Sequence, residues 1–187
     1  MNFIFKLLFF VLGWKVIGNI PKQVKKGVFA VAPHNKWQDF LIGIGVRAAM
    51  DLKIGYIGKS QLFKPPFGFF FRWLGGTPAY RTENNNMVES YVNAVNSSSD
   101  MLFALAPEGT RKNVEKLRTG FYFMANGANI PIIMIGFDLP KKTVLIADPF
   151  MPSGDFKEDM KKYFVPFFEK IDGFQKKWIN NYKNDIF

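Results

Sequence analysis

A histidine and an aspartate in the stretch Pro33–Asp39 could together perform proton transfer. His34 is the only histidine in 187 residues, and Asp39 follows it five positions later. On a single ideal helix these two side chains would lie about 140° apart and face different ways. They meet only if His34 lies in a turn and Asp39 lies in the first turn of the helix that follows. Asp39 would then orient one ring nitrogen and leave the other to take a proton from a substrate hydroxyl. The competing interpretation is a purely structural pair.

A second polar group, Glu108–Arg111, follows directly on the apolar run at residues 101–106. Such a run is typical of a strand buried on both faces, and open α/β sheets bind their ligands at the carboxyl ends of their strands. Thr110 offers a hydroxyl, Arg111 offers a two-pronged donor that suits phosphate, and Gly109 allows the backbone to approach closely. The group predicts an anion site, and the alternative is a capped turn with a solvated arginine.

Two more basic residues could contact the same anion, namely Arg81 and Lys59. The chain carries a formal charge of +10, and residues 1–81 hold all of the excess, with 12 Lys and Arg against 2 Asp and Glu. Basic residues mixed with many aromatics favour a nucleic acid or an anionic membrane as partner, and the high apolar content favours the membrane. The absence of cysteine excludes a disulfide and a thiol nucleophile. With a single histidine as well, no zinc or iron site is expected.

The elements that must position these groups can be read from the apolar pattern. With 187 residues, of which 48% are hydrophobic, the chain is long enough for one domain with its own core. Short apolar runs alternate with segments of helical periodicity, which predicts a single α/β domain whose central, mostly parallel sheet is flanked by helices. Strands are expected over 28–32, 51–58, 101–106, 131–137 and 143–147, and helices over 37–49, 67–74, 87–97, 119–128, 156–170 and 174–182.

The first 26 residues are interpreted as a membrane-contacting segment ahead of a catalytic domain at 27–187. Lys6 and Lys15 interrupt the apolar run at 1–20, so it falls short of the roughly 20 nearly uncharged residues of a spanning helix. No small-residue cleavage site marks it as a signal peptide. An amphipathic helix lying at the membrane surface fits best. Packing against the core of the domain, or a marginal membrane span, are the alternatives.

The stretch 62–74 is unusually aromatic. Six of its thirteen residues carry rings, and Lys64 and Arg72 lie among them. A helix packed in the core would explain the rings. The interleaved basic residues equally suit a surface that touches lipid or an acyl chain.

Four motifs come in the order and approximate spacing of those of the glycerolipid acyltransferases. They are Pro33-His34-x4-Asp39-Phe40 (the HX4D motif), Gly75–Arg81, Pro107–Arg111 and Asn129–Ile133. Over residues 27–150 the chain resembles the lysophospholipid acyltransferases, and most closely the compact bacterial lysophosphatidic acid (1-acylglycerol-3-phosphate) acyltransferases.

The resemblance implies direct transfer of an acyl chain from acyl-CoA or acyl carrier protein to the free hydroxyl of a lysophospholipid, without an acyl-enzyme or a cofactor. His34 would be the general base and Asp39 its partner. The enzyme would work at the cytoplasmic face of a membrane that contains anionic lipid. Pro131 would lie near the acyl-donor site. The residues that would hold the acceptor are Lys59, Arg81, Glu108, Gly109, Thr110 and Arg111.

Other functions stay open at this point. The same chemistry could act on a lyso-amino-acid lipid, such as a lyso-ornithine or glycine lipid, whose carboxylate would meet Arg81 and Arg111. A non-catalytic lipid-binding protein could use residues 1–26 and 62–74, but it would leave the HX4D motif without a purpose. A nucleic-acid binder is the weakest option, because no known binding motif is visible.

Overall fold

The computed structural model describes residues 2–34, 36–79, 87–172 and 177–187. Its centre is a seven-stranded sheet in the order β1-β7-β6-β2-β5-β3-β4. Neighbouring strands are parallel except for β6 and β7. The predicted α/β domain with a mostly parallel sheet is therefore confirmed. The strands are β1 (Lys15–Ile17), β2 (Lys26–Ala32), β3 (Ile54–Lys59), β4 (Gly76–Ala79), β5 (Met101–Leu105), β6 (Ile132–Asp138) and β7 (Thr143–Ile146).

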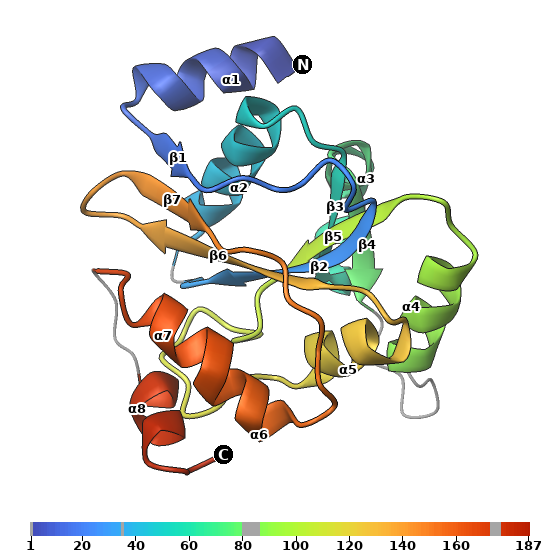
Figure 1. Ribbon diagram of the computed structural model, residues 1–187. Helices are drawn as coiled ribbons and strands as arrows, with labels where there is room; N and C mark the ends of the chain where they lie inside the picture. Colours follow the sequence, from blue (N-terminus) through green and yellow to red (C-terminus); the bar gives the residue numbers. More distant parts are fainter. Residues whose placement is uncertain (1, 35, 80–86, 173–176) are drawn as a thin grey trace.

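Helices cover both faces of the sheet (Figure 1). The helical segments of the described residues are α1 (Asn2–Val11), α2 (Gln38–Ala49), η1 (Ser60–Phe63), α3 (Gly68–Trp73), α4 (Met87–Asn96), α5 (Gly120–Gly127), α6 (Phe156–Asp159), η2 (Met160–Phe164), α7 (Val165–Phe168) and α8 (Lys177–Lys183). The segment expected as one helix over 156–170 is divided, because η2 is a π-helical turn between α6 and α7.

The central strand β2 separates two hydrophobic cores. Its side chains alternate between the faces, as in any strand. Val28 and Ala30 join the core under α5 to α8. Phe29 joins the core under α1 and α2. Because β2 is covered on both sides and its neighbours are strands, its carboxyl end is held rigidly, and the turn that follows it has a fixed starting point.

The amino-terminal segment differs from the expected continuous helix over 1–20. Helix α1 ends at Val11, and Lys15–Ile17 form β1, which adds an edge strand to the sheet by pairing with β7. Helix α1 itself packs on α2, where the ring of Phe9 lies against Gly45. The second half of the predicted helix is thus wrong, because residues 15–17 find backbone partners that lie 128 positions further along the chain. None of the helices of the described residues is long and apolar enough to cross a membrane.

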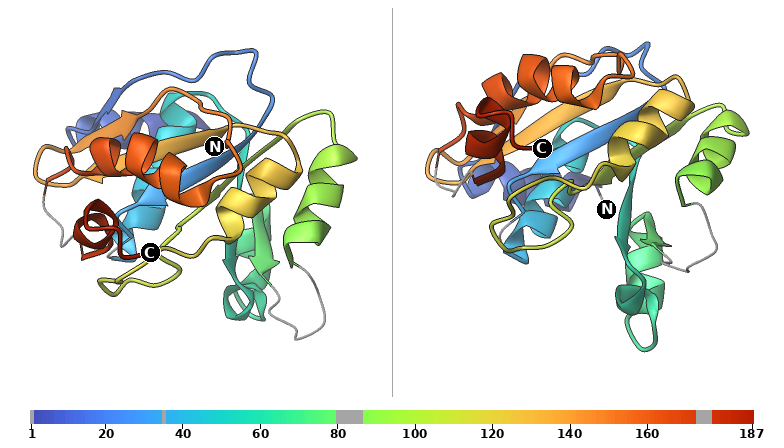
Figure 2. Two further views of the ribbon diagram at one scale, coloured as in Figure 1. Left: turned by 60° about the horizontal axis from the view of Figure 1, so that its bottom comes forward. Right: turned by 90° about the horizontal axis from the view of Figure 1, so that it is seen from below.

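The aromatic stretch forms a projection from the sheet. After β3 the chain makes η1 and α3 before it returns as β4, and Figure 2 shows this unit standing away from the body. Most of its large apolar side chains are exposed: Leu62, Phe67, Phe69, Phe70 and Trp73. Phe63 and Leu74 are the buried ones among them. We call residues 60–74 the aromatic finger. Of the two interpretations of this stretch, an aromatic core helix is wrong.

Candidate active site

The topology brings the predicted motifs to one edge of the sheet. The strands β2, β5, β3 and β4 are neighbours in this order and run parallel, so their carboxyl ends lie side by side. His34 follows β2, Glu108 follows β5 and Lys59 ends β3. This is the edge at which parallel α/β sheets bind ligands.

His34 and Asp39 meet in the way that the spacing required. His34 lies in the turn after β2, and Asp39 lies in the first turn of α2. The His34 Nδ1 and Asp39 Oδ2 atoms are 3.5 Å apart, which is at the limit of a hydrogen bond and typical of a catalytic pair before substrate binds. The carboxylate of Asp39 also accepts the backbone N–H of Lys36 at 2.8 Å, which fixes the turn between them. Asp39 is buried, whereas the side chain of His34 is 29% exposed.

Glu108 joins the two motifs directly. Its carboxylate oxygen Oε2 accepts the backbone N–H of His34 at 2.7 Å, across 74 residues of sequence. Glu108 is only 6% exposed. The resemblance assigned Glu108 to the acceptor. In the structure its carboxylate supports the main chain of His34, and a carboxylate would repel a phosphate rather than bind it.

The electrostatics of Glu108 fit this buried position. Burial raises the pKa of the Glu108 carboxyl above its usual range, and the backbone N–H and the charge of His34 act in the opposite direction. The indole N–H of Trp178 also lowers the pKa of Glu108. That N–H is buried and has no hydrogen-bond partner of good geometry within the described residues. Glu108 therefore accepts one hydrogen bond, from the backbone N–H of His34, and Trp178 lies close enough to influence its pKa.

The loop at 106–119 carries the remaining acceptor candidates. It folds back on itself, because the N–H of Gly109 donates to Ala106 and the N–H of Arg118 donates to Pro107. Gly109 has a φ of 63°, which favours glycine. A Cβ at this position would lie 3.1 Å from Cγ of Arg118, so the Arg118 side chain packs over the turn. Thr110 is half-buried, and Arg111 is exposed.

Two predicted acceptor residues cannot be placed fully. Lys59 is the last residue of β3 and pairs with Ala79, so its backbone lies at the same edge as His34. Its side chain and the whole of Arg81 lie outside what the structure describes.

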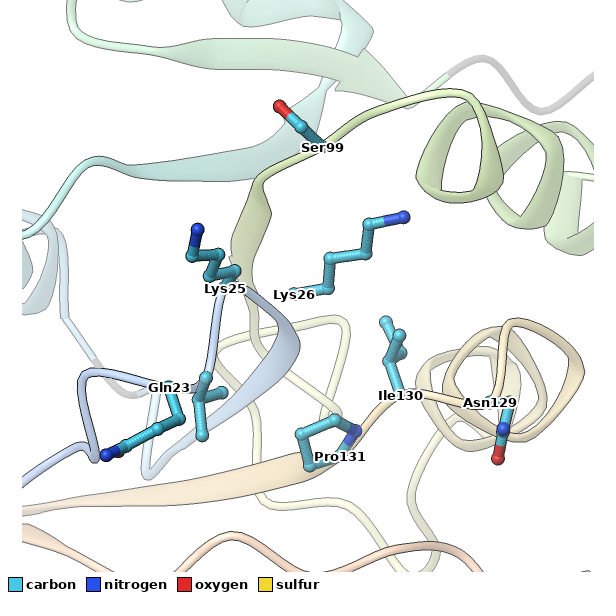
Figure 3. Close-up of a pocket in the computed structure, with 8 residues that line it drawn as sticks. Gln23, Lys25, Lys26, Ser99, Asn129, Ile130 and Pro131 are labelled. Atoms are coloured by element: carbon cyan, nitrogen blue, oxygen red, sulfur yellow. The ribbon is translucent and has the colours of Figure 1, made fainter.

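Pro131 lies at the opposite edge of the sheet. It immediately precedes β6 and is bonded to Val28 near the start of β2. Val28 and His34 are six positions apart along β2 and the turn that follows it, which is up to about 20 Å. Pro131 instead lines an open cavity of about 410 Å³ together with Lys25, Lys26 and Ser99 (Figure 3). Pro131 therefore does not contact the His34 site, and the expectation that it lies near the acyl-donor site stays untested.

No metal centre is evident in the part of the chain that the structure describes. Within it, His, Asp and Glu side chains nowhere gather in groups of three or more that could hold an ion. The arrangement around His34 consists of one imidazole, one orienting carboxylate and one supporting carboxylate. It can move a proton between a bound hydroxyl and the exposed side of the ring.

Comparison with known proteins identifies the class of protein. Residues 14–138, more than half of the chain, match the acyltransferase family, and the chain belongs to that family. The crystal structure of the 1-acyl-sn-glycerophosphate (LPA) acyltransferase PlsC from Thermotoga maritima has a similar fold, with a TM-score of 0.61. The two chains are 20% identical, and the match covers 90% of this chain and 75% of the other. No curated protein sequence matches at a significant level.

Two residues near the site were missed from the sequence. Arg118 lies over the Gly109 turn, and Trp178 lies beside Glu108. Arg118 lies in the same loop, seven residues after Arg111, so a search for cations on both sides of the Glu108–Arg111 group would have found it. Trp178 belongs to an ordinary amphipathic segment 70 residues further on, and its sequence carries no signal of its place in the site.

Proposed function

We propose that this acyltransferase moves an acyl chain from an acyl thioester to the free hydroxyl of a lysophospholipid, with 1-acylglycerol-3-phosphate as the acceptor and phosphatidic acid as the product. The observation that carries the proposal is the setting of His34. One ring nitrogen faces a buried carboxylate, the ring is partly exposed, and the backbone N–H is bonded to the motif that carries Thr110 and Arg111.

The geometry supports a direct transfer. With Nδ1 facing Asp39, Nε2 of His34 is the nitrogen left for the substrate. It accepts the proton of the acceptor hydroxyl while the oxygen attacks the thioester carbonyl. The new C–O ester bond forms, the C–S bond breaks, and the imidazolium returns the proton to the departing thiolate. Asp39 stabilises the imidazolium in between. The sequence has no cysteine, and the proposed route needs no protein nucleophile.

The phosphate of the acceptor would lie close to the Glu108–Arg111 group. Arg111 follows Glu108 by three residues, which span at most about 11 Å, and Glu108 touches the backbone of His34. A guanidinium binds phosphate through two parallel hydrogen bonds. Thr110, the backbone at Gly109, Arg81 and Lys59 are the other proposed contacts. A hydroxyl bound at His34 and a phosphate bound by Arg111 fit the two ends of a small glycerol phosphate headgroup.

A membrane surface is the proposed source of both lipid substrates. Helix α1 packs through Phe9 and exposes most of its other large apolar residues. The aromatic finger begins at the carboxyl end of β3, which is the edge that carries His34. Its exposed rings, with Lys64 and Arg72 among them, suit the headgroup region of an anionic bilayer. We infer a peripheral attachment at the cytoplasmic face, with the His34 edge towards the lipid.

The test is an assay of purified protein with a panel of lyso-lipids and two acyl donors, acyl-CoA and acyl carrier protein. We expect the highest kcat/KM with 1-acylglycerol-3-phosphate. Preference for a lyso-ornithine or glycine lipid would change the proposed acceptor but keep the proposed acyl-transfer chemistry. Binding to vesicles without consumption of any thioester would reject the proposal that the protein acylates lyso-lipids.

The role of His34 is tested separately. His34→Ala should lower kcat by a factor on the order of 10²–10⁴ while the protein still binds vesicles. Turnover retained by the variant would contradict the assignment.

A further inference from the structure

The loop at 106–119 has little regular structure of its own. It connects β5 to α5, contains neither a helix nor a strand, and carries the Glu108–Arg111 group. Its two ends are joined by the bond between Arg118 and Pro107. In the outer part, residues 112–117, Leu117 is buried in the core cluster that also holds Trp178 and Tyr182 of α8, and Val114 packs against this cluster.

Helix α8 supports this loop. The buried N–H of Leu117 donates to the hydroxyl of Tyr182 at 2.8 Å. The side-chain amide of Asn181 donates to the carbonyl of Glu115 at 2.8 Å. The backbone N–H of Lys177 donates to the side chain of Asn113 at 3.3 Å. Figures 1 and 2 show α8 lying beside the yellow-green loop. Three hydrogen bonds from successive turns of one short helix thus meet one side of the loop.

The same helix also reaches the inner part of the loop. Trp178 is 1% exposed and packs against Phe168 and Tyr182. It lies close enough to Glu108 to lower the pKa of that carboxyl, although its indole N–H has no hydrogen-bond partner of good geometry within the described residues. Glu108 in turn holds the backbone N–H of His34. Helix α8 thus comes near Glu108, the residue that bonds to the turn carrying His34. Helix α8 lies outside residues 14–138, the part of the chain that matches the family.

We propose that α8 is a clamp that positions the loop at 106–119 for acceptor binding, with Tyr182 and Asn181 as positioning residues that touch no substrate. The proposal rests on the proposed function, since the loop is taken to hold the acceptor phosphate. The clamp fixes the distance between the base at His34 and the cation at Arg111. A displaced loop would weaken acceptor binding without changing the donor site.

A matched pair of surface variants tests the clamp with little risk to folding. Asn181 and Asn184 lie three residues apart, and the side-chain amide of each donates to a backbone carbonyl. Asn181 bonds to Glu115 in the loop, whereas Asn184 bonds to Asn180 in its own helix. Asn181→Ala should raise the KM for 1-acylglycerol-3-phosphate about two- to threefold, with the KM for acyl-CoA and the thermal midpoint unchanged. Asn184→Ala should change none of these values.

A second matched pair tests the clamp in the core. Tyr182 and Tyr122 are both fully buried. The hydroxyl of each accepts one backbone N–H, from Leu117 and from Gly154 respectively. Replacement by Phe removes one buried acceptor in each case, so both variants should lose stability. Tyr122→Phe should lose more, because the Tyr122 hydroxyl also donates to the buried carboxylate of Asp159 at 2.7 Å. Only Tyr182→Phe should raise the acceptor KM, by about five- to tenfold, because only its partner lies in the loop.

Hydrogen exchange separates failure of the clamp from failure of the proposed function. In the full chain without substrate, the amide of Leu117 should exchange at least about fivefold faster in Tyr182→Phe than in Tyr122→Phe. If the wild-type protein does not acylate the lysophospholipid but this difference is seen, the substrate proposal falls and the clamp remains. If the two tyrosine variants show equal exchange at Leu117 and equal acceptor KM, the clamp is refuted.

Discussion

Replacing Glu108 distinguishes a support for His34 from a ligand for the acceptor. Glu108→Gln keeps an oxygen that can accept the His34 N–H and removes the negative charge. Glu108→Ala removes both. If the main task of Glu108 is the 2.7 Å bond to the His34 backbone, the glutamine variant should keep most of the activity and the alanine variant should not. If the charge itself acts on the substrate, both variants should fail alike.

The size of the effect follows from the contacts. In Glu108→Ala the N–H of His34 loses its acceptor, which costs about 1–3 kcal/mol, and the His34 ring is free to shift. A displacement of about 1 Å at a catalytic group costs on the order of 10²-fold in rate. In Glu108→Gln the bond remains, but the amide nitrogen can come to face the N–H of Trp178, so we expect a stability within about 1 kcal/mol of the wild type and a kcat within about tenfold.

The pH dependence of unfolding gives an independent check. Burial raises the pKa of Glu108, so the folded protein keeps this proton to a higher pH than the unfolded chain does. The contribution of Glu108 to the free energy of unfolding therefore decreases as the pH rises through and above the usual range of a glutamate carboxyl. In Glu108→Gln this decrease is absent, because the amide does not titrate. Denaturant unfolding of both proteins from acid to neutral pH should show that the free energy of unfolding of Glu108→Gln rises relative to that of the wild type as the pH increases.

Steady-state kinetics with acyl-CoA and 1-acylglycerol-3-phosphate complete the assay. We expect the acceptor KM of Glu108→Gln to stay equal or to fall, because a negative charge near the phosphate is gone. A glutamine variant as inactive as the alanine variant, or one with a strongly raised acceptor KM, would refute the reasoning and return Glu108 to the substrate.

Three further outcomes are expected. Asp39→Asn should lower kcat by a factor on the order of 10²–10⁴ with a small change in thermal midpoint, because the amide no longer holds the His34 ring in the required tautomer; unchanged kcat would remove Asp39 from the mechanism. Gly45→Ala should destabilise the protein by about 1–3 kcal/mol in denaturant unfolding, because the new Cβ would lie 2.5 Å from the ring of Phe9; an unchanged midpoint would mean that α1 does not dock on α2. Phe69→Ser should weaken binding to vesicles that contain anionic lipid without loss of stability, because this ring is 76% exposed; equal binding in a flotation assay would exclude the aromatic finger from the membrane contact.

The fold was predictable because its signals are local. Apolar runs of strand length and helical periodicity lie within single segments of 5 to 12 residues, and their alternation determines a parallel sheet. The strand β1 was not predictable in the same way. Three residues carry no periodicity, and β1 exists only because Thr143–Leu145 offer a free edge. A short edge strand is created by its partner and not by its own sequence.

For the candidate site, the sequence predicted how His34 and Asp39 meet but not the contacts of Glu108. The spacing of His34 and Asp39 allowed only one geometry, and the structure has it. Glu108 was assigned to acceptor binding from its motif. The motif indicates that a carboxylate is needed, but it does not indicate which group this carboxylate contacts. That bond joins residues 74 positions apart. Trp178 has no motif at all, and only tertiary packing brings it beside Glu108.

The two halves of the site depend on different parts of the chain, and this has a consequence for how the site fails. His34 and Asp39 are placed by β2 and α2, the central strand and the helix that follows it, within 24 residues of sequence. The proposed acceptor loop is placed by α8, near the carboxyl terminus. Glu108 is the contact that joins the two halves. Because the first half rests on a doubly covered strand and the second on a short helix, partial opening should begin at the loop. His34, the proposed base, would then remain oriented while the proposed acceptor site is lost, so mild denaturant should raise the acceptor KM before it lowers kcat.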